Sequence, residues 1–101
     1  MEQEMSDSLD SLQMVRVRGD SMIPTLYAGD QVMICKADCY GKGDIIVYPY
    51  KDKGLVIHRL IAESGDTYIC RGDNNQYFER IKKETVLGKV IWMKGRKTRD
   101  V

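Results

Sequence analysis

Ser21 and His58 are the two residues whose side chains together could perform covalent catalysis. A serine hydroxyl is a weak nucleophile and requires a neighbouring base that takes its proton. His58 is the only histidine in the chain, and the alternation of a strand in "GLVIHRLI" places it on one face with Val56 and Leu60. The opposite face would carry Leu55, Ile57, Arg59 and Ile61. A single imidazole among apolar neighbours is either a satisfied core group or a tuned base.

The loop around Ser21, "RVRGDSMIPTLYAGDQ", has the composition of a shaped turn. Gly19 and Gly29 permit backbone conformations that other residues resist, and Pro24 fixes one backbone dihedral. A nucleophile and its oxyanion-hole amides must be positioned before the reaction, so a rigid turn at a strand end suits them. Gly, Asp, Ser and Pro are also common turn formers without any catalytic role. The loop alone is therefore compatible with both interpretations.

A catalytic histidine usually requires an acid that orients it. In "CRGDNNQYFERI" the candidates are Glu79 and Asp73, and their spacing does not decide between them. Asn74 and Asn75 are more typical of turns than of catalytic groups.

The three cysteines suggest a different interpretation, in which His58 is a ligand of a structural zinc ion and not a catalytic base. Cys35 and Cys39 form a C-x3-C pair, within the spacing that structural zinc sites use. Cys70 and His58 would complete a Cys3His set. However, "VMIC" and "YIC" end strand-like runs, and free cysteines are often simply buried. An odd count without a secretory signal also argues against a disulfide framework, so we expect reduced thiols, no metal and no cofactor.

The composition is that of one small globular domain. The chain has 101 residues, of which 43% are hydrophobic and 31% are charged, as in ordinary soluble proteins. The formal net charge of +1 gives no strong field toward nucleic acid or an anionic membrane, so neither is an expected partner.

No apolar run approaches the roughly 20 residues that span a bilayer, and the acidic N-terminus lacks the features of a secretory signal. We expect a cytoplasmic protein, soluble or attached to a membrane only peripherally.

Short strands must carry these residues. Apolar and β-branched runs separated by Gly/Asp turns, with a spacing of about 8 to 12 residues, predict a mostly β domain. Strands are expected at 14–18, 31–37, 45–50, 55–63, 67–72 and 90–93, with helical turns near Pro24 and in "IKKETVLG". We predict a flexible N-terminal segment at 1–13, the domain at 14–94 and a basic tail at 95–101. The six tyrosines are expected to pack strands.

Three blocks in order resemble the S24/S26 group of serine peptidases, which includes signal peptidases and LexA-like repressors. "GDSMIPTLYAGDQV" resembles the nucleophile box, "KGDIIVY" the strand that follows it, and "GLVIHRLI" the base box. In bacterial signal peptidases and LexA-like repressors the base is a lysine in a Lys-Arg pair, whereas here the pair is His58-Arg59. That pair and "CRGDNN" are similar to the Ser-His signal peptidases of the endoplasmic-reticulum type. The resemblance covers about residues 14 to 93, and three ordered motifs are far more specific than one.

The resemblance implies a fold and a mechanism. The fold would be LexA/signal-peptidase-like and mostly β, with curved antiparallel strands and one or two short helical turns. Ser21 would attack the scissile carbonyl, and His58 would accept its proton and later return it to the leaving amine. The oxyanion and substrate-binding side would involve the backbone amide of Ser21 together with Gly19, Met22 and Pro24.

The chain departs from the family pattern at the acid and at the N-terminus. The family's acid is an Asp several residues beyond the Gly-Asp-Asn-Asn stretch, where this chain has Phe78-Glu79. Glu79 is therefore the first choice for orienting His58, and Asp73 is the second.

Signal peptidases of this type usually carry an N-terminal transmembrane helix, which this sequence does not show. We expect a soluble serine endopeptidase that removes a leader or signal-like segment from a peptide or protein precursor, with small residues favoured beside the scissile bond.

Other interpretations fit less well. A repressor-type protein would need a DNA-binding domain and a self-cleavage site, and no Ala-Gly or Cys-Gly pair precedes Ser21. One alternative is a non-catalytic module on the same fold that holds an extended peptide by strand addition. Another is a zinc-stabilised β domain. The sequence leaves the oligomeric state open.

Overall fold

Seven strands and two 3₁₀ turns form the part of the chain that the computed structural model describes, residues 12–94. The strands are β1 (Leu12–Arg16), β2 (Gln31–Cys35), β3 (Ile45–Pro49), β4 (Leu55–Ser64), β5 (Thr67–Arg71), β6 (Glu79–Lys82) and β7 (Gly88–Lys94). The turns are η1 (Lys51–Lys53) and η2 (Lys83–Thr85). Within these residues, no helix is long and apolar enough to cross a membrane. The predicted tail and most of the predicted flexible segment lie outside the described residues, although 12 and 13 belong to β1.

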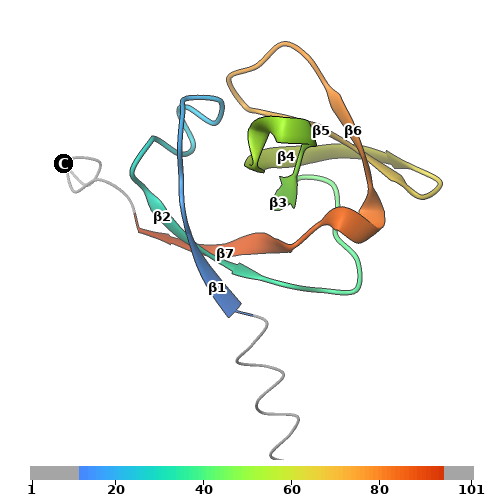
Figure 1. The fold of residues 1–101 in the computed structure, drawn as a ribbon, viewed down its shortest axis with the longest axis horizontal. Helices are drawn as coiled ribbons and strands as arrows, with labels where there is room; N and C mark the ends of the chain where they lie inside the picture. Colours follow the sequence, from blue (N-terminus) through green and yellow to red (C-terminus); the bar gives the residue numbers. More distant parts are fainter. Residues whose placement is uncertain (1–11, 95–101) are drawn as a thin grey trace, which may run out of the picture.

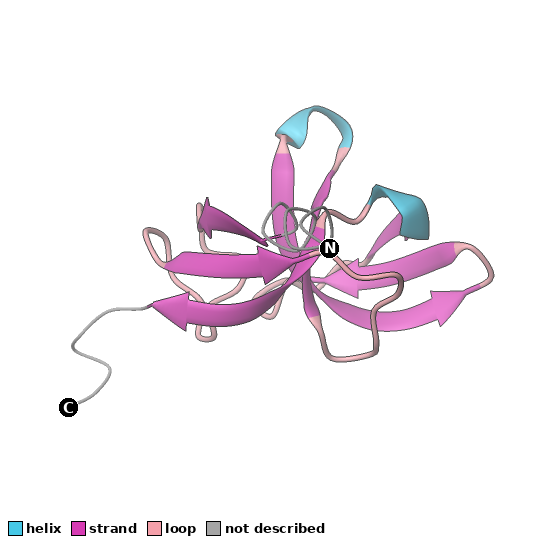
Figure 2. Ribbon diagram, turned by 90° about the horizontal axis from the view of Figure 1, so that it is seen from below, coloured by secondary structure: helices cyan, strands magenta, loops and turns pink. Residues whose placement is uncertain are grey.

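All seven strands join one antiparallel sheet in the order β1-β2-β7-β3-β4-β5-β6. Strands β3 to β6 are consecutive neighbours, and β7 returns to the place between β2 and β3. The sheet curls instead of lying flat (Figure 1), and seen from below its strands run in crossing directions (Figure 2). The predicted mostly β architecture of curved antiparallel strands is therefore confirmed.

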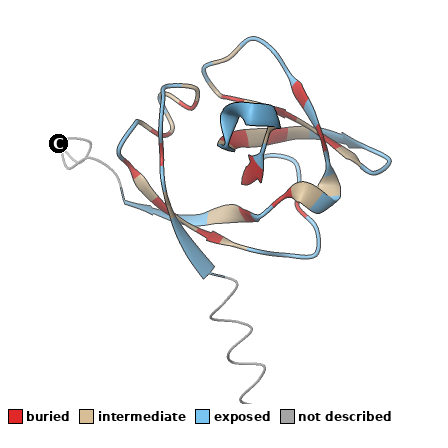
Figure 3. Ribbon diagram, in the orientation of Figure 1, coloured by how far each residue is buried: buried red, intermediate tan, exposed pale blue. Residues whose placement is uncertain are grey.

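Strand alternation divides the buried apolar residues into two clusters. The aliphatic cluster contains Val17, Met22, Leu26, Val32, Ile34, Ile45, Val47 and Ile57. The tyrosine cluster contains Tyr40, Ile46, Tyr48, Leu60, Tyr68, Cys70, Ile81 and Val86. Alternate residues of β3 contribute to each cluster, so this short strand is buried along most of its length (Figure 3).

The alternation predicted for β4 is confirmed. Ile57 belongs to the aliphatic cluster, whereas Leu60 belongs to the tyrosine cluster and Val56 packs against it. His58 is 5% exposed, and its ring meets that of Tyr48 edge to face in the tyrosine cluster, with centroids 6.3 Å apart. The strand therefore presents His58 on the predicted face.

Strand β6 is absent from the sequence-based prediction. Residues 79 to 82 pair with β5, although three of the four residues in "ERIK" are charged. Glu79 and Ile81 are buried while Arg80 and Lys82 are exposed, so the strand alternation exists but one inward position holds a carboxylate. The helical turn expected in "IKKETVLG" is present as η2, and β7 begins at Gly88, before the predicted residue 90.

Candidate active site

The loop between β1 and β2 carries Ser21 and is fixed by its own buried side chains. Met22 and Leu26 belong to the aliphatic cluster and are 1% and 0% exposed. The amides of Thr25 and Leu26 both donate to the carbonyl of Met22, at 2.7 and 2.9 Å, which closes a tight turn. Ser21 itself is half-buried. Its position therefore follows in part from the burial of Met22 and Leu26 in the same turn.

Backbone hydrogen bonds close the two ends of this loop. Val17 N donates to Asp30 O at 2.8 Å, and Gly29 N donates to Val17 O at 2.9 Å. Gly19 has a φ of +71°, a conformation that residues with a Cβ adopt at a cost. Pro24 lies on the exposed side of the turn, after a cis peptide bond. The predicted role of these glycine and proline residues as shapers of the loop is consistent with this geometry.

His58 lies between the serine and an acid. Its Nε2 is 3.1 Å from Ser21 Oγ, and its Nδ1 is 2.9 Å from Glu79 Oε1. The carboxylate of Glu79 can only accept, so Nδ1 carries the proton and Nε2 keeps a lone pair directed at the serine. The three residues come from the β1–β2 loop, from β4 and from the start of β6.

Burial keeps the imidazole of His58 neutral. Desolvation lowers the pKa of His58 below its ordinary 6.5, and the negative charge and hydrogen bond of Glu79 offset part of this effect. Glu79 is 3% exposed. At pH 7 the imidazole is therefore an available base, with a buried carboxylate beside it to stabilise the charge that it gains on protonation.

The loop after β5 packs against the backbone of the serine. Asn74 N donates to Ser21 O at 2.8 Å, and Asn74 Nδ2 donates to Asp20 O at 3.0 Å. A Cβ built on Gly72 would lie 2.6 Å from Ser21 O and 2.8 Å from Asn75 Nδ2. Only glycine fits at this contact, which explains the glycine of the "CRGDNN" motif.

Arg59 joins the segments that carry Ser21 and His58. Its Nε and Nη2 donate to the two oxygens of Asp73 at 2.8 and 2.7 Å, and this pairing holds the pKa of the Asp73 carboxyl below its usual range. Thr25 Oγ1 donates to the same carboxylate at 2.5 Å. Asp73, the second choice for orienting His58, therefore pairs with Arg59, and the structure brings Glu79 to His58 instead.

The side chain of Met22 has a supporting position. Its Sδ accepts a hydrogen bond from Asp73 N at 3.3 Å, and the side chain is buried in the aliphatic cluster. Met22 is thus turned away from solvent, and its contribution to a bound substrate would be limited to its backbone.

The cysteines do not assemble the Cys3His set. Cys35 is half-buried, Cys39 is exposed and Cys70 is buried. Among residues 12–94, no group of three or more His, Cys, Asp or Glu side chains is arranged to hold a metal ion. Burial raises the pKa of the Cys70 thiol to about 11, so Cys70 is an uncharged core residue.

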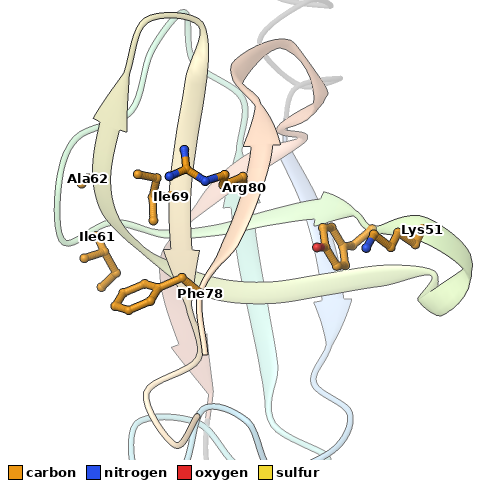
Figure 4. Close-up of a pocket in the computed structure, with 7 residues that line it drawn as sticks. Lys51, Ile61, Ala62, Ile69, Phe78 and Arg80 are labelled. Atoms are coloured by element: carbon orange, nitrogen blue, oxygen red, sulfur yellow. The ribbon is translucent and has the colours of Figure 1, made fainter. Parts of the chain in front are cut away.

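A pocket of about 670 Å³ lies over β4, β5 and β6 (Figure 4). Its lining consists of Tyr50, Lys51, Ile61, Ala62, Ile69, Phe78 and Arg80. The guanidinium of Arg71 lies 5.2 Å from the centre of the Phe78 ring. Ser21, His58 and Glu79 are not among the lining residues, so the pocket is separate from the hydrogen-bonded group that they form.

Further residues support the site beyond those expected from the sequence. They are Tyr48, which contacts Glu79, and Arg59, Gly72 and Thr25. The "CRGDNN" motif contained a signal for Gly72, and the His58-Arg59 pair contained one for Arg59. Tyr48 looked like any strand-packing aromatic residue, because its partner is 31 positions away in the chain.

Comparison with known proteins agrees with the motifs and the fold. Residues 1–91 match the family model described as "Peptidase S24-like". The chain therefore belongs to the S24-like peptidase family, as the ordered motifs predicted.

Two curated relatives bear the same name, LexA repressor. The protein of Shouchella clausii (strain KSM-K16) is 37% identical over 78 residues, which cover 74% of this chain and 36% of the relative. The protein of Ligilactobacillus salivarius (strain UCC118) is 32% identical over 88 residues, covering 84% of this chain and 42% of the relative. The chain thus spans about two fifths of the length of the curated relatives it matches.

Proposed function

We propose that the chain is a serine endopeptidase in which Ser21 is the nucleophile, His58 the general base and Glu79 the orienting acid. One observation carries this proposal, the continuous path from Ser21 Oγ through both nitrogens of His58 to Glu79 Oε1, with steps of 3.1 and 2.9 Å. Membership of a serine peptidase family supports it. A buried neutral imidazole hydrogen-bonded to both an alcohol and a carboxylate is the arrangement that nucleophilic serine catalysis requires.

The reaction follows from these contacts. Ser21 Oγ attacks the scissile carbonyl carbon while its proton passes to His58 Nε2, and Glu79 stabilises the imidazolium through Nδ1–H. Collapse of the tetrahedral intermediate breaks the C–N bond, and Nε2 returns the proton to the leaving amine. Water then attacks the acyl-enzyme by the same route in reverse, which releases the acid and restores the serine.

The nucleophile loop would supply the oxyanion hole. The backbone amide of Ser21 lies in a turn that Gly19, Met22 and Pro24 shape, and a preformed backbone donor stabilises a developing oxyanion without reorganisation. Buried Met22 and the Asn74 contact to Ser21 O hold this turn. The substrate would be an extended segment of a peptide or protein precursor, such as a leader.

A second candidate function is self-cleavage as part of a regulator. The name that both curated relatives carry, LexA repressor, favours it. In that case the scissile segment would belong to the same polypeptide, and a DNA-binding region elsewhere in it would bring nucleic acid as a partner.

Peptide cleavage tests the proposal directly. The full chain is incubated with a diverse peptide library, and new termini are identified by mass spectrometry. We expect Ser21→Ala and His58→Ala each to lower cleavage by at least about 10³-fold. Ser64→Ala, which alters an exposed serine at the end of β4, should cleave like the parent chain. Equal cleavage by Ser21→Ala and the parent chain would contradict the assignment.

Concentration dependence separates the two candidates. Processing of a separate precursor accelerates in proportion to enzyme concentration, whereas self-cleavage within one polypeptide has a rate constant that does not depend on dilution. Self-cleavage is measured at several dilutions on a polypeptide in which a candidate segment is fused before residue 1.

A further inference from the structure

Tyr48 places a buried hydroxyl on the acid of the proposed site. Its OH donates to Glu79 Oε1 at 2.6 Å and lies 3.3 Å from His58 Nδ1. Tyr48 is 0% exposed and comes from β3, whose residue Ile46 lies opposite His58 in the sheet. A single carboxylate oxygen therefore faces two donors, the phenol and the imidazole.

The direction of the phenol hydrogen bond follows from protonation. Burial, followed by the hydrogen bond to Glu79, raises the pKa of Tyr48 above its ordinary 10, so the phenol keeps its proton and donates it. The carboxylate of Glu79 accepts from both neighbours. Charge-assisted hydrogen bonds of this length are among the stronger ones in proteins, so Tyr48 fixes the position of Oε1 and takes part of its negative charge.

We propose that Tyr48 is a positioning residue that acts on His58 through Glu79, by holding Oε1 against Nδ1 and by limiting how strongly the carboxylate attracts the imidazole proton. This proposal rests on the function proposed above and assigns to it a residue that does not touch the substrate. Two consequences follow. The carboxylate stays aligned with His58 Nδ1, and it stabilises the imidazolium less strongly, so the proton that Nε2 accepted from Ser21 passes more readily to the leaving amine.

The surroundings of His58 contain few other groups that could produce the same effect. Ser21 faces it from the β1–β2 loop, Glu79 from β6 and Tyr48 from β3. The charges of Lys53 and Asp73 also act on the pKa of His58, with smaller effects than burial and Glu79 have. Cys70 of β5 interacts with Tyr48 as an uncharged thiol.

A purely structural role for Tyr48 is the competing explanation, and Tyr68 provides a matched control. Tyr68 is 1% exposed in the same cluster, and its hydroxyl accepts from Tyr40 N at 3.0 Å, without contact to the site. Tyr48→Phe and Tyr68→Phe each remove one buried hydroxyl from one aromatic cluster. A difference between the two variants at His58 therefore reports the contact with Glu79 rather than the loss of packing.

The first measurement is an NMR titration of His58 in the full chain. Because the chain has one histidine, its imidazole C–H signals need no further assignment. Without the phenol, Glu79 directs more of its charge to His58, so we expect the midpoint in Tyr48→Phe to move up by about half a pH unit to one unit. Tyr68→Phe should titrate like the parent chain. A midpoint in Tyr48→Phe equal to that of Tyr68→Phe would overturn the proposal.

The second measurement is the pH profile of cleavage. In Tyr48→Phe the acidic limb of kcat/KM should move to higher pH, and kcat on the plateau should fall about threefold to tenfold because Glu79 is less firmly held. KM should stay unchanged, because Tyr48 does not reach the substrate. An unshifted limb together with an unchanged kcat would also overturn the proposal.

The two proposals fail in different ways. Cleavage that persists in Ser21→Ala would remove the proposed function, yet the NMR titration would still test whether Tyr48 acts on His58. Conversely, loss of cleavage in Ser21→Ala with identical titrations for both Tyr→Phe variants would keep the peptidase assignment and reject the role of Tyr48.

Discussion

The two buried clusters of this small sheet position the two halves of the site by different means. The aliphatic cluster carries the β1–β2 loop, which contains Ser21, through Met22 and Leu26, and the members of this cluster are apolar. The tyrosine cluster lies beside His58 and Glu79 and contains hydroxyl groups that make specific hydrogen bonds. Apolar packing and hydrogen bonds to the backbone set where Ser21 stands, whereas the position of His58 also depends on hydrogen bonds between buried side chains.

This difference has a physical basis. A serine needs only a fixed backbone and a neighbouring base, and non-directional apolar packing together with the backbone hydrogen bonds of the loop provides the fixed backbone. A buried base must in addition keep one tautomer and gain a charge during the reaction, which requires oriented acceptors in a low-dielectric environment. Perturbing the aliphatic cluster should therefore change stability first, and perturbing the tyrosine cluster should change activity first.

Among the variants that compare the two clusters, the largest effect is expected from Glu79→Gln. Glu79→Gln keeps the shape of the side chain but removes the charge that stabilises the imidazolium, so kcat/KM should fall about 10²-fold to 10⁴-fold. Steady-state cleavage of a peptide from the library measures this loss. Glu63→Gln, on the exposed part of β4, is the matched control and should leave kcat/KM within twofold or so of the parent value. A Glu79→Gln protein with parental kcat/KM would mean that the carboxylate charge does not assist His58.

The aliphatic cluster should respond in stability instead. Leu26→Ala removes a fully buried side chain and should lower the free energy of unfolding by about 2–5 kcal/mol. Leu55→Ala removes the same atoms from a side chain that is 51% exposed and should cost less than about 0.5 kcal/mol. Urea denaturation measures both. The acidic limb of kcat/KM should be the same in the folded Leu26→Ala protein as in the parent chain, and a shifted limb would show that the two clusters are not separable.

The contact between Gly72 and Ser21 should affect both properties. A Cβ at 2.6 Å from Ser21 O must displace the loop or the strand end, and overpacking of this kind costs about 1–3 kcal/mol. A shift of the nucleophile on the order of 1 Å can also lower turnover by about 10²-fold. Gly41→Ala is the control, because the nearest atom to its Cβ would be 4.0 Å away. Thermal melting measures the stability of both variants, and steady-state cleavage measures their kcat. Equal stability and equal kcat in Gly72→Ala and Gly41→Ala would contradict the close packing.

Sequence reasoning reached the parts of this arrangement that depend on local patterns. The period-two alternation of β4 placed His58 on the correct face, opposite Ile57, and the Gly/Asp turns marked most strand ends. The order of the motifs also led to the correct family. These features are readable because each depends on residues that are close together in the chain.

The remaining parts depend on pairs that are distant in the chain. β6 was missed because "ERIK" has too few apolar residues to show a strand, and the inward position of Glu79 makes sense only once His58 and Tyr48 are opposite it. The partners of Glu79 and Asp73 are also distant in the chain, so the spacing of the sequence did not show which of the two lies next to His58. The partner of Asp73 turned out to be Arg59, 14 residues away.

The smallest of the expected effects is the pH dependence of stability, which the single histidine makes measurable. The folded state lowers the pKa of His58 below 6.5, so the unfolded chain binds a proton more readily. The contribution of His58 to the free energy of unfolding should therefore be fully present above about pH 6.5. It should decrease as the pH falls, by at most about 1.4 kcal/mol per pH unit. Carboxylates such as Asp73, whose pKa is lowered by Arg59, lose their contribution only at still lower pH.

Urea denaturation between pH 5.5 and 7 isolates this contribution. His58→Gln should remove the slope, whereas Tyr68→Phe should keep it at a lower absolute stability. Tyr48→Phe should reduce it, because a stronger attraction from Glu79 brings the pKa of His58 closer to its unfolded value. A slope that is identical in Tyr48→Phe and Tyr68→Phe would mean that the phenol does not act on the imidazole. The tyrosine cluster would then resemble the aliphatic one, with packing as the only means by which it positions the site.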